Sequence, residues 1–350
     1  MKRLVKMNET YVFVVLALLC LLVQARSGQF FRVYNLIDLL VALIVPAMFA
    51  LNTHVVIASG GIDVSFPCIA SFCMYVVTRI LQMIEYQGSV VLAFVMAAVI
   101  GAIMGALNGW LIASFRLPPL IVTLGTQSLF TGVLMGVLEA IEISGSKLPS
   151  CITSFGLQRL YETVNPENNI ITYIPTSLLI LVGAVIVTYV ILKHTMFGRS
   201  IFAVGNDENA ALRAGIPVKR IKIAVYCYAG LVAGVAGIVR MCITKFCHPT
   251  NLTGIEMEVI AAVVLGGTSI AGGKGSITGA MLGIALITVM SNSLLLLGIP
   301  VQWQTFCTGI LIIFGTGLSA YQAMRAGKKL MRRTKIQPAE KPAAEGGQTA

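Results

Sequence analysis

Residues 89–115 read SVVLAFVMAAVIGAIMGALNGWLIASF, a run without a charged side chain. This run is long enough to cross a bilayer as one helix, which takes about 20 apolar residues. The whole chain of 350 residues has the same character, since 57% of its residues are hydrophobic and 11% are charged, against about 25% charged residues in soluble domains. Such a chain needs lipid as its solvent, which excludes a soluble enzyme, a secreted disulfide scaffold and a disordered linker protein.

Outward from this run, the hydropathy pattern predicts an all-α fold, a polytopic membrane helical bundle of about ten transmembrane helices. The predicted spans are 10–25, 36–58, 66–84, 89–115, 118–138, 172–192, 221–243, 257–271, 275–297 and 301–322. The eighth is short and interrupted by glycine, so we expect a re-entrant segment or two half-helices there. The pattern therefore predicts one transmembrane domain over 1–325, with a cytoplasmic loop at 193–220, followed by a tail at 326–350 that is basic and then disordered.

Basic residues in the loops set the predicted orientation. The loop 193–220 and the tail after residue 325 are rich in Lys and Arg, whereas the loop 139–171 on the opposite side is acidic. Under the positive-inside rule, this pattern places both termini in the cytoplasm. These loops also account for the net charge of +11, so we interpret the charge as a sign of membrane topology and expect no nucleic-acid partner.

The chain lacks the residue patterns of an enzyme or a metalloprotein. Its cysteines include no CxxC pair and mostly lie in or beside apolar runs, as small buried hydrophobes do. The histidines His54, His194 and His248 are far apart in sequence, and neither HExxH nor GxSxG occurs. The glycine-rich run 266–275 departs from a phosphate loop at both ends, where Thr268 and Gly275 stand. We predict no catalytic residue, no metal site and no ATPase site, and an active site inside the membrane is left open.

Glycines recur at intervals of four residues within several predicted spans. These glycines are Gly101, Gly105 and Gly109, then Gly230 and Gly234, then Gly275, Gly279 and Gly283. Each set forms a smooth stripe along one helix face, which lets a second helix approach closely in lipid. We expect these stripes to pack helices within the bundle rather than to form a subunit interface.

Polar residues inside the spans indicate a pathway. Burying a polar group in lipid is costly, so by default it faces a cavity or a partner. For any one such residue, local hydrogen bonding is the commoner role, but together they predict a neutral pathway lined by hydroxyl and amide groups. The residues assigned to it are Gly60, Gly61, Asp63, Ser65, Thr123, Thr126, Gln127 and Asn292. Such a lining suits a polyhydroxylated solute, and the scarcity of intramembrane carboxylates argues against coupling to protons or sodium.

The loop 193–220 contains the signals of a short isolated helix. Asn206 or Asp207 can cap its start, and Glu208 suits its positive first turn. Gly215 can end it in a left-handed conformation, and Pro217 blocks continuation. A helix of about two turns is marginal alone in water. We therefore expect it to dock, either on the membrane face of its own protein or in a groove of a cytoplasmic partner.

Four blocks of the sequence resemble the permease subunits of ribose-type sugar ABC importers, in the superfamily that includes the branched-chain amino acid permeases. The segment 60–65, GGIDVS, is similar to the family's GGIDLS, and 118–126, PPLIVTLGT, is similar to PPFIVTLGT. The segment 198–216 resembles the family's coupling loop, and 261–276 resembles AAVVIGGTSLSGGRGS. The chain departs from the family at Phe66-Pro67-Cys68, where small residues are usual, and at Glu208-Asn209, where the family has paired glutamates.

The resemblance implies a role in import rather than catalysis. It implies a permease of the bacterial inner membrane that imports a monosaccharide, such as ribose or a related pentose or hexose. It also implies an ATP-binding cassette subunit that uses ATP and Mg, a periplasmic solute-binding protein, and a second permease copy or paralogue, with no cofactor on this chain. The coupling role carries over to Gly205, Asn206, Asp207, Glu208, Ala210, Ala211, Gly215 and Ile216.

Other solutes and another class of transporter stay open at this stage. Autoinducer-2, a nucleoside or a branched-chain amino acid is the alternative solute, although an amino acid carboxylate favours a cationic site and no central Lys or Arg is evident. A self-sufficient secondary transporter or channel is the alternative class. The bulky ring at Phe66 predicts a changed or smaller solute if that segment borders the pathway.

Overall fold

The computed structural model describes residues 2–164 and 171–303, together with residues 306, 309, 310, 313 and 317. Its helices are α1 (Lys2–Ser27), α2 (Val33–Ala58), α3 (Phe66–Met83), α4 (Val91–Phe115), α5 (Pro119–Gly132), η1 (Val133–Val137), η2 (Gly145–Lys147), α6 (Ser150–Leu157), α7 (Ser177–His194), α8 (Met196–Asn206), α9 (Glu208–Arg213), α10 (Val218–Thr244), α11 (Glu256–Leu265), α12 (Ile277–Leu296) and η3 (Val301–Trp303). The strands are β1 (Ile143–Ser144), β2 (Arg159–Val164), β3 (Ile171–Pro175) and β4 (Phe246–Cys247).

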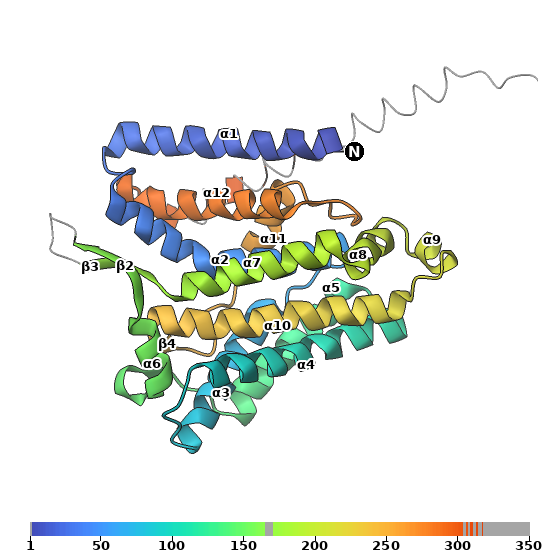
Figure 1. Cartoon of the computed structure of the whole chain (residues 1–350), viewed down its shortest axis with the longest axis horizontal. Helices are drawn as coiled ribbons and strands as arrows, with labels where there is room; N and C mark the ends of the chain where they lie inside the picture. The colour runs from blue at the N-terminus through green and yellow to red at the C-terminus, as the bar shows by residue number, and fades with distance from the viewer. Residues whose placement is uncertain are drawn as a thin grey trace, which may run out of the picture.

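The long helices lie side by side along one direction, as Figure 1 shows. The hairpin of β2 and β3, together with α6 and β4, lies at one end of the bundle, which we call the hairpin end. The short helices α8 and α9 lie at the opposite end, the α9 end, as does the N-terminal end of α1. Eight helices in the described part of the chain are long and apolar enough to cross a membrane. This arrangement confirms the predicted all-α polytopic bundle.

Burial divides these helices into inner and outer members. In α2, every residue from Ala47 to Ala58 is buried, because the helix is apolar on nearly all sides and is surrounded by other helices. The outermost, α1, exposes Phe13, Leu18 and Leu22. Exposed apolar side chains on a helix of this length are the surface that lipid covers.

The glycine stripes pack helices within the chain, as predicted. A methyl group added to Gly101 or Gly105 of α4 would overlap the backbone of α10 at Gly230 and Tyr226, and Gly234 meets Ala97 in the same way. On α12, Gly283 meets Ala262 of α11 and Gly279 meets Gly266, the residue that follows α11. Gly275, predicted in the same stripe, lies outside α12 in the preceding loop. Helix axes this close are possible because glycine presents no side chain, and in lipid such packing drives helix association.

The predicted eighth span is a broken one. Its helix, α11, has ten residues and so rises about 15 Å, roughly half of the hydrocarbon thickness. The chain continues as the glycine-rich loop 266–276 before α12 begins. Such irregular backbone is tolerated at membrane depth where protein buries it. Most of the tenth predicted span, 301–322, and the whole tail 326–350 lie outside the described residues, so these boundaries stay predictions.

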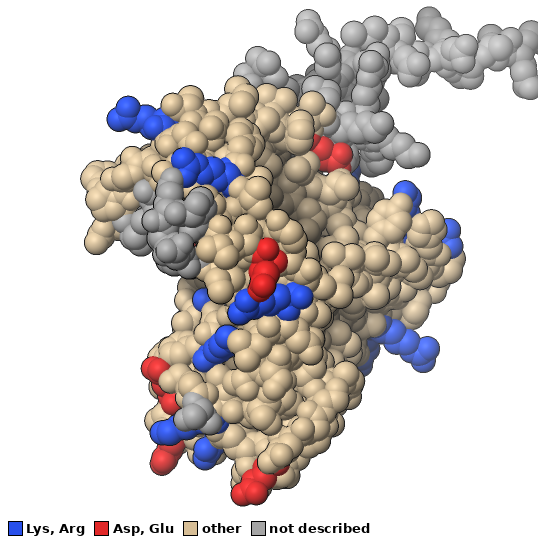
Figure 2. All heavy atoms as spheres, turned by 60° about the vertical axis from the view of Figure 1, so that its left-hand side comes forward, with Lys and Arg blue, Asp and Glu red and all other residues tan. Residues whose placement is uncertain are grey.

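The hairpin end holds more structure than the sequence analysis predicted. The segment 139–171, expected as a loop, contains α6 and parts of two antiparallel pairs, β1 with β4 and β2 with β3. A π-helical turn, η1, ends the fifth span. Figure 2 looks partly onto this end and shows Lys and Arg interspersed with Asp and Glu, whereas the side of the bundle is mostly uncharged.

Candidate coupling segment and translocation pathway

The predicted short helix is present as α9, and its two ends are capped as the sequence indicates. The Asp207 carboxylate accepts a hydrogen bond from the Ala210 N–H at 3.0 Å, which is the N-cap bond. At the other end, Gly215 has φ +80°, its N–H donates to Leu212 O at 3.0 Å, and the Ile216 N–H donates to Ala211 O at 3.1 Å. These two bonds form a Schellman motif, which needs a left-handed residue at the Gly215 position.

The preceding helix, α8, was missed in the sequence analysis. The Thr195 hydroxyl caps it by accepting a hydrogen bond from the Gly198 N–H at 3.1 Å. Its buried positions include Ile201 and Val204, three residues apart, which face the bundle while Arg199 is exposed. A threonine cap followed by apolar residues at helical spacing was the available signal. The candidate coupling segment is therefore the helix pair α8–α9, residues 196–213.

An ion pair ties α9 to the next transmembrane helix. Lys222 of α10 contacts the Glu208 carboxylate at 2.6 Å. Of the two, Glu208 is the more exposed, and exposed pairs contribute about 1 kcal/mol at most. Beyond this pair, α9 buries Ala211 against the bundle and leaves Leu212 59% exposed. An exposed leucine on a short, capped helix gives a partner an apolar contact point.

Of the predicted pathway residues between α2 and α3, Asp63 and Ser65 belong to one buried polar network, Gly61 is buried, and Gly60 is exposed. Both the N–H and the hydroxyl of Ser65 donate to Asp63 Oδ1 at 2.7 Å. Asn108 of α4 donates to the Ser65 hydroxyl at 2.9 Å, and the Val64 N–H donates to Thr123 of α5 at 3.3 Å. The break 59–65 is thereby fastened to two neighbouring helices.

Two further polar groups reach this network, and the sequence analysis did not single them out. The Tyr226 hydroxyl lies against Gly61, where an added Cβ would be 2.5 Å away. That hydroxyl and Asn108 Oδ1 are buried without a hydrogen-bond partner among the described residues. Unsatisfied buried groups are costly and therefore rare in stable proteins. The Tyr226 hydroxyl can donate or accept a hydrogen bond, whereas Asn108 Oδ1 can only accept one.

The α5 residues of the predicted pathway lie beside α3. Thr126 is buried, and its hydroxyl donates to Thr123 O at 3.3 Å, whereas Gln127 is half-buried. The thiol of Cys68 lies 3.5 Å from Gln127 O. The Phe66 ring packs on the Phe49 ring with centroids 5.0 Å apart and is fully buried. The bulky residue at position 66 therefore fills the core of the bundle.

The remaining pathway residue, Asn292, lies apart from this network. It is exposed on α12, and its amide donates to Thr288 O of the previous turn at 2.9 Å. Helix α12 packs on α1, α2 and α11 rather than on α5. Among the described residues, no hydrogen bond joins Asn292 to the break 59–65, and its assignment rests on the sequence alone.

A second polar contact holds the loop 266–276. His54 Nδ1 lies 2.9 Å from the Thr268 hydroxyl, and both side chains are buried. Further along the loop, the hydroxyl of Ser276 contacts the Glu9 carboxylate of α1, and the Thr278 hydroxyl bonds the same oxygen at 2.8 Å. The described residues contain no cluster of three His, Cys, Asp or Glu residues suited to a metal ion.

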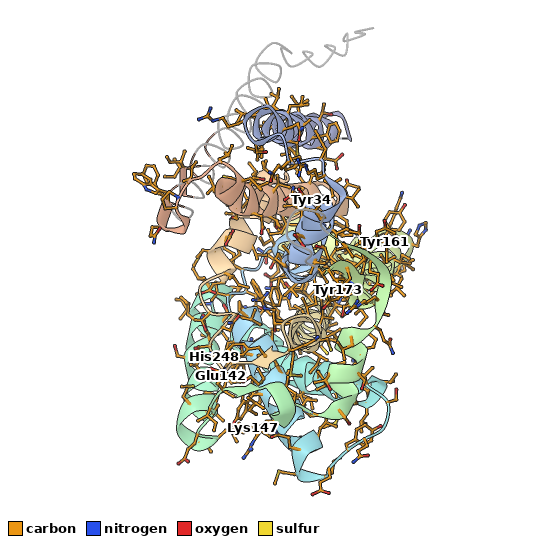
Figure 3. All side chains as sticks on the ribbon, turned by 90° about the vertical axis from the view of Figure 1, so that its left-hand side faces the viewer. Tyr34, Glu142, Lys147, Tyr161, Tyr173 and His248 are labelled. Atoms are coloured by element: carbon orange, nitrogen blue, oxygen red, sulfur yellow. The ribbon has the colours of Figure 1, made fainter. Side chains whose placement is uncertain are left out.

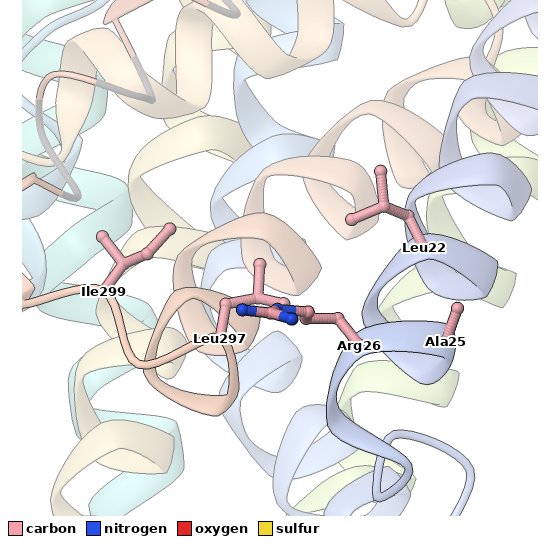
Figure 4. A pocket seen from close by; sticks show the side chains of 5 residues that line it. All are labelled: Leu22, Ala25, Arg26, Leu297 and Ile299. Atoms are coloured by element: carbon pink, nitrogen blue, oxygen red, sulfur yellow. The ribbon is translucent and has the colours of Figure 1, made fainter.

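A groove near the hairpin end is separate from these polar residues. It is lined by Leu22, Ala25 and Arg26 of α1 and by Leu297 and Ile299 after α12, as Figure 4 shows. The labelled polar and aromatic side chains of Figure 3, such as Tyr161 and Tyr173 on the hairpin, also lie toward that end. None of these residues belongs to the coupling segment or to the network around the break 59–65.

These features define a class of protein. A polytopic bundle with two broken segments, buried polar side chains and a capped helix pair on one end has the features expected of a protein that moves a solute across a membrane. The chain matches the family described as branched-chain amino acid transport system / permease component over residues 35–315, and it belongs to that family. It is therefore a transporter permease.

Its relatives include several sugar permeases. The chain is 33% identical over 314 residues to the ribose import permease protein RbsC of Bacillus subtilis, covering 86% of this chain and 89% of that protein. It is 30% identical to the fructose import permease protein FrcC of Rhizobium meliloti, covering 84% and 80%. It is 29% identical to the L-arabinose ABC transporter permease protein AraH of Azospirillum brasilense, covering 90% and 88%. No solved structure matches the chain.

Proposed function

We propose that this chain is the membrane-spanning subunit of an ATP-driven importer of a monosaccharide, such as ribose or a related pentose or hexose. The similarity to ribose, fructose and L-arabinose permeases supports a sugar as the solute. The buried polar groups fit this solute class, because Ser65, Asn108, Thr123 and Tyr226 offer hydroxyl and amide groups beside the single carboxyl group of Asp63. Sugar hydroxyls both donate and accept hydrogen bonds, as these groups do.

The observation that carries the proposal is the capped helix pair α8–α9. In this proposal its docking surface consists of the exposed residues Asn206, Asp207, Glu208, Ala210, Leu212 and Gly215 and the half-buried Ile216. The other two predicted coupling residues, Gly205 and Ala211, are buried against the bundle and do not belong to this surface. In this proposal an ATP-binding cassette subunit receives α9 in a groove, hydrolyses ATP with Mg and moves the pair. The permease itself holds no nucleotide. The α9 end then faces the cytoplasm, with the N-terminus and C-terminus on that side in the inner membrane.

The opposite end of the bundle receives the solute. A periplasmic solute-binding protein docks there, and the exposed side chains of the hairpin, Leu160, Tyr161 and Val164, give it a contact surface. A second permease copy or paralogue pairs with this chain inside the membrane. The half-buried Gln127 and the exposed Ser128 on α5 favour a protein rather than a lipid neighbour for that face.

Transport follows as a change between two conformations. Solute enters from the binding protein while the α9 end is closed. Movement of α8–α9 by the ATPase subunit then opens the network around the break 59–65, and solute hydroxyls replace the hydrogen bonds that the network loses. Free energy comes from ATP hydrolysis on the partner, so the permease needs no catalytic residue.

An uptake panel tests this function. Radiolabelled pentoses, hexoses, autoinducer-2, a nucleoside and leucine are offered to cells with and without this chain, with the ATPase subunit and binding protein present in both. We expect one sugar to be lost when the chain is deleted. Loss of leucine or of another non-sugar instead would overturn the solute class. Uptake that persists without the ATPase subunit would overturn the coupling and favour a secondary transporter.

A further inference from the structure

Three backbone segments that are distant in sequence meet beside the coupling segment. They are the end of α2 with the break that follows, the end of α8, and the loop 266–276 after α11. The Gly273 N–H donates to Ala58 O at 3.0 Å. We name the residues at this meeting point, Ala58, Gly60, Gly205, Gly272 and Gly273, the glycine junction.

The junction is packed backbone against backbone. A Cβ on Gly205 would lie 2.7 Å from the Gly273 N atom and would overlap Ala58 O. A Cβ on Gly272 would lie 2.8 Å from Gly60 Cα and 2.5 Å from Gly205 O. Contacts below 3 Å leave no room for a side chain to adjust. Close-packed interiors transmit strain, so a displacement of one segment is passed to the other two.

Gly205 differs from the other glycines of the junction. Gly60, Gly272 and Gly273 have φ values of +84°, +81° and +70°, which by themselves favour glycine. Gly205 lies within α8 in helical conformation, so its backbone angles suit any residue. What requires glycine at this position is the contact with Ala58 and Gly273. A substitution at Gly205 therefore tests the contact alone, because it adds no strain from unfavourable backbone angles.

One side of the junction is fixed to the coupling segment. Gly205 precedes Asp207, the N-cap of α9, by two residues, and the Asp207 N–H donates to Ala203 O at 3.2 Å. Movement of α9 therefore shifts the end of α8 with it. Only Asp207 separates the end of α8 from the start of α9, so no flexible linker between the two helices can absorb the displacement.

The other side is fixed to the interior of the bundle. From Gly60 the chain enters the polar network, where Val64 bonds Thr123 and Ser65 bonds Asn108. Asn108 lies seven residues before the end of α4 at Phe115, a depth of about 10 Å. From Gly273 the loop runs back to Thr268, which bonds His54 of α2. Both broken segments of the bundle thus connect to one junction.

We infer that Gly205 is a positioning residue for solute transport, which carries displacement of α8–α9 directly to the breaks 59–65 and 266–276 through the glycine junction. This inference rests on the proposed function. The competing route runs through the flanking helices α7 and α10 as rigid levers, with the junction serving as packing alone. The two routes differ in what a methyl group at position 205 does to coupling.

The first test uses the whole complex, with permease, ATPase subunit and binding protein, in lipid vesicles. Gly205→Ala is compared with Gly183→Ala, because Gly183 lies in α7 and its added Cβ would meet no atom within 4 Å. We expect Gly205→Ala to retain the ATPase subunit and ATP hydrolysis while solute imported per ATP falls by about tenfold, as overpacking a tight contact predicts. Gly183→Ala should match the wild type. A wild-type ratio in Gly205→Ala would overturn the inference.

The second test needs no substitution and so does not depend on a variant that folds. Amide hydrogen exchange of the wild-type complex is measured with and without ATP and vanadate. We expect exchange to change together in peptides covering 58–65, 203–216 and 266–276. A change confined to 203–216 would overturn the inference and leave the proposed function standing. A wild-type complex that imports solute independently of ATP would instead overturn the proposed function itself.

Discussion

Replacing Asp207 with alanine tests whether α9 must be held as a helix before a partner can bind it. Asp207 supplies the N-cap bond to the Ala210 N–H at 3.0 Å, and α9 has six residues. Removing an N-cap costs about 1 kcal/mol. A helix this short is marginal without support, and α9 buries little more than Ala211. The lost bond is therefore not compensated nearby.

A loss of about 1 kcal/mol lowers the ratio of helical to frayed α9 about fivefold. If the ATPase subunit binds the helical form, its apparent affinity falls by up to the same factor, because affinity scales with the populated fraction. The assay is binding of purified ATPase subunit to the permease in lipid nanodiscs, followed by ATP-driven uptake in vesicles. We expect weaker binding by Asp207→Ala, with uptake restored at high ATPase concentration.

The matched control is Asp207→Asn, which keeps an acceptor oxygen of similar capping strength and removes the charge. We expect this variant to bind like the wild type. Unchanged binding by Asp207→Ala would refute the argument that the cap holds α9. If both variants bound the ATPase subunit equally weakly, the argument would also fail, because the effect would then come from the lost charge and not from the lost hydrogen bond.

Three further substitutions test the rest of the structure. Gly101→Leu should abolish folded, monodisperse protein in detergent, because α4 meets α10 at that position. Gly183→Leu on an open face should purify normally. Equal yields of the two variants would contradict the close packing of α4 on α10. Gly215→Leu should cut uptake while the protein stays in the membrane, since φ +80° costs a residue with a side chain about 1–2 kcal/mol; wild-type uptake would argue against a role for the α9 end cap. Asn108→Ala removes the donor to Ser65 and should lower stability by about 1 kcal/mol in thermal unfolding; an unchanged Tm would show that the network contributes nothing.

The sequence predicted features that depend on local physics. Apolar length is enough to find eight of the ten predicted spans among the described residues. Asp207 and Gly215 are enough to bound α9, because caps act on neighbouring backbone groups. The stripe from Gly101 to Gly109 predicted close helix packing and left its partner, α10, unnamed. Which helix fills a smooth face depends on the path of the whole chain, so spacing alone cannot supply it.

The features that escaped prediction join distant segments. Asn108 gave no signal, since a single amide in an apolar helix does not reveal that it meets Ser65, 43 residues earlier. The contact of Gly205 with Ala58 and Gly273 was likewise invisible. The glycines of 266–276 predicted a helix break, and that prediction did not indicate that this loop closes on α8. The role of Asn292 stays a prediction.

Two kinds of contact hold the break 59–65, and the proposed mechanism uses them differently. On one side, hydrogen bonds to Asn108 and Thr123 hold it, and each contributes about 1 kcal/mol net. On the other side, Gly60 meets Gly205 and Gly272 through backbone atoms, where further approach is opposed by steric overlap. Under the proposed mechanism, a displacement of α8 is transmitted by the backbone contact, and the weaker hydrogen bonds break. In that mechanism the polar groups released can bond a sugar hydroxyl, so the movement that opens the break also presents its binding groups.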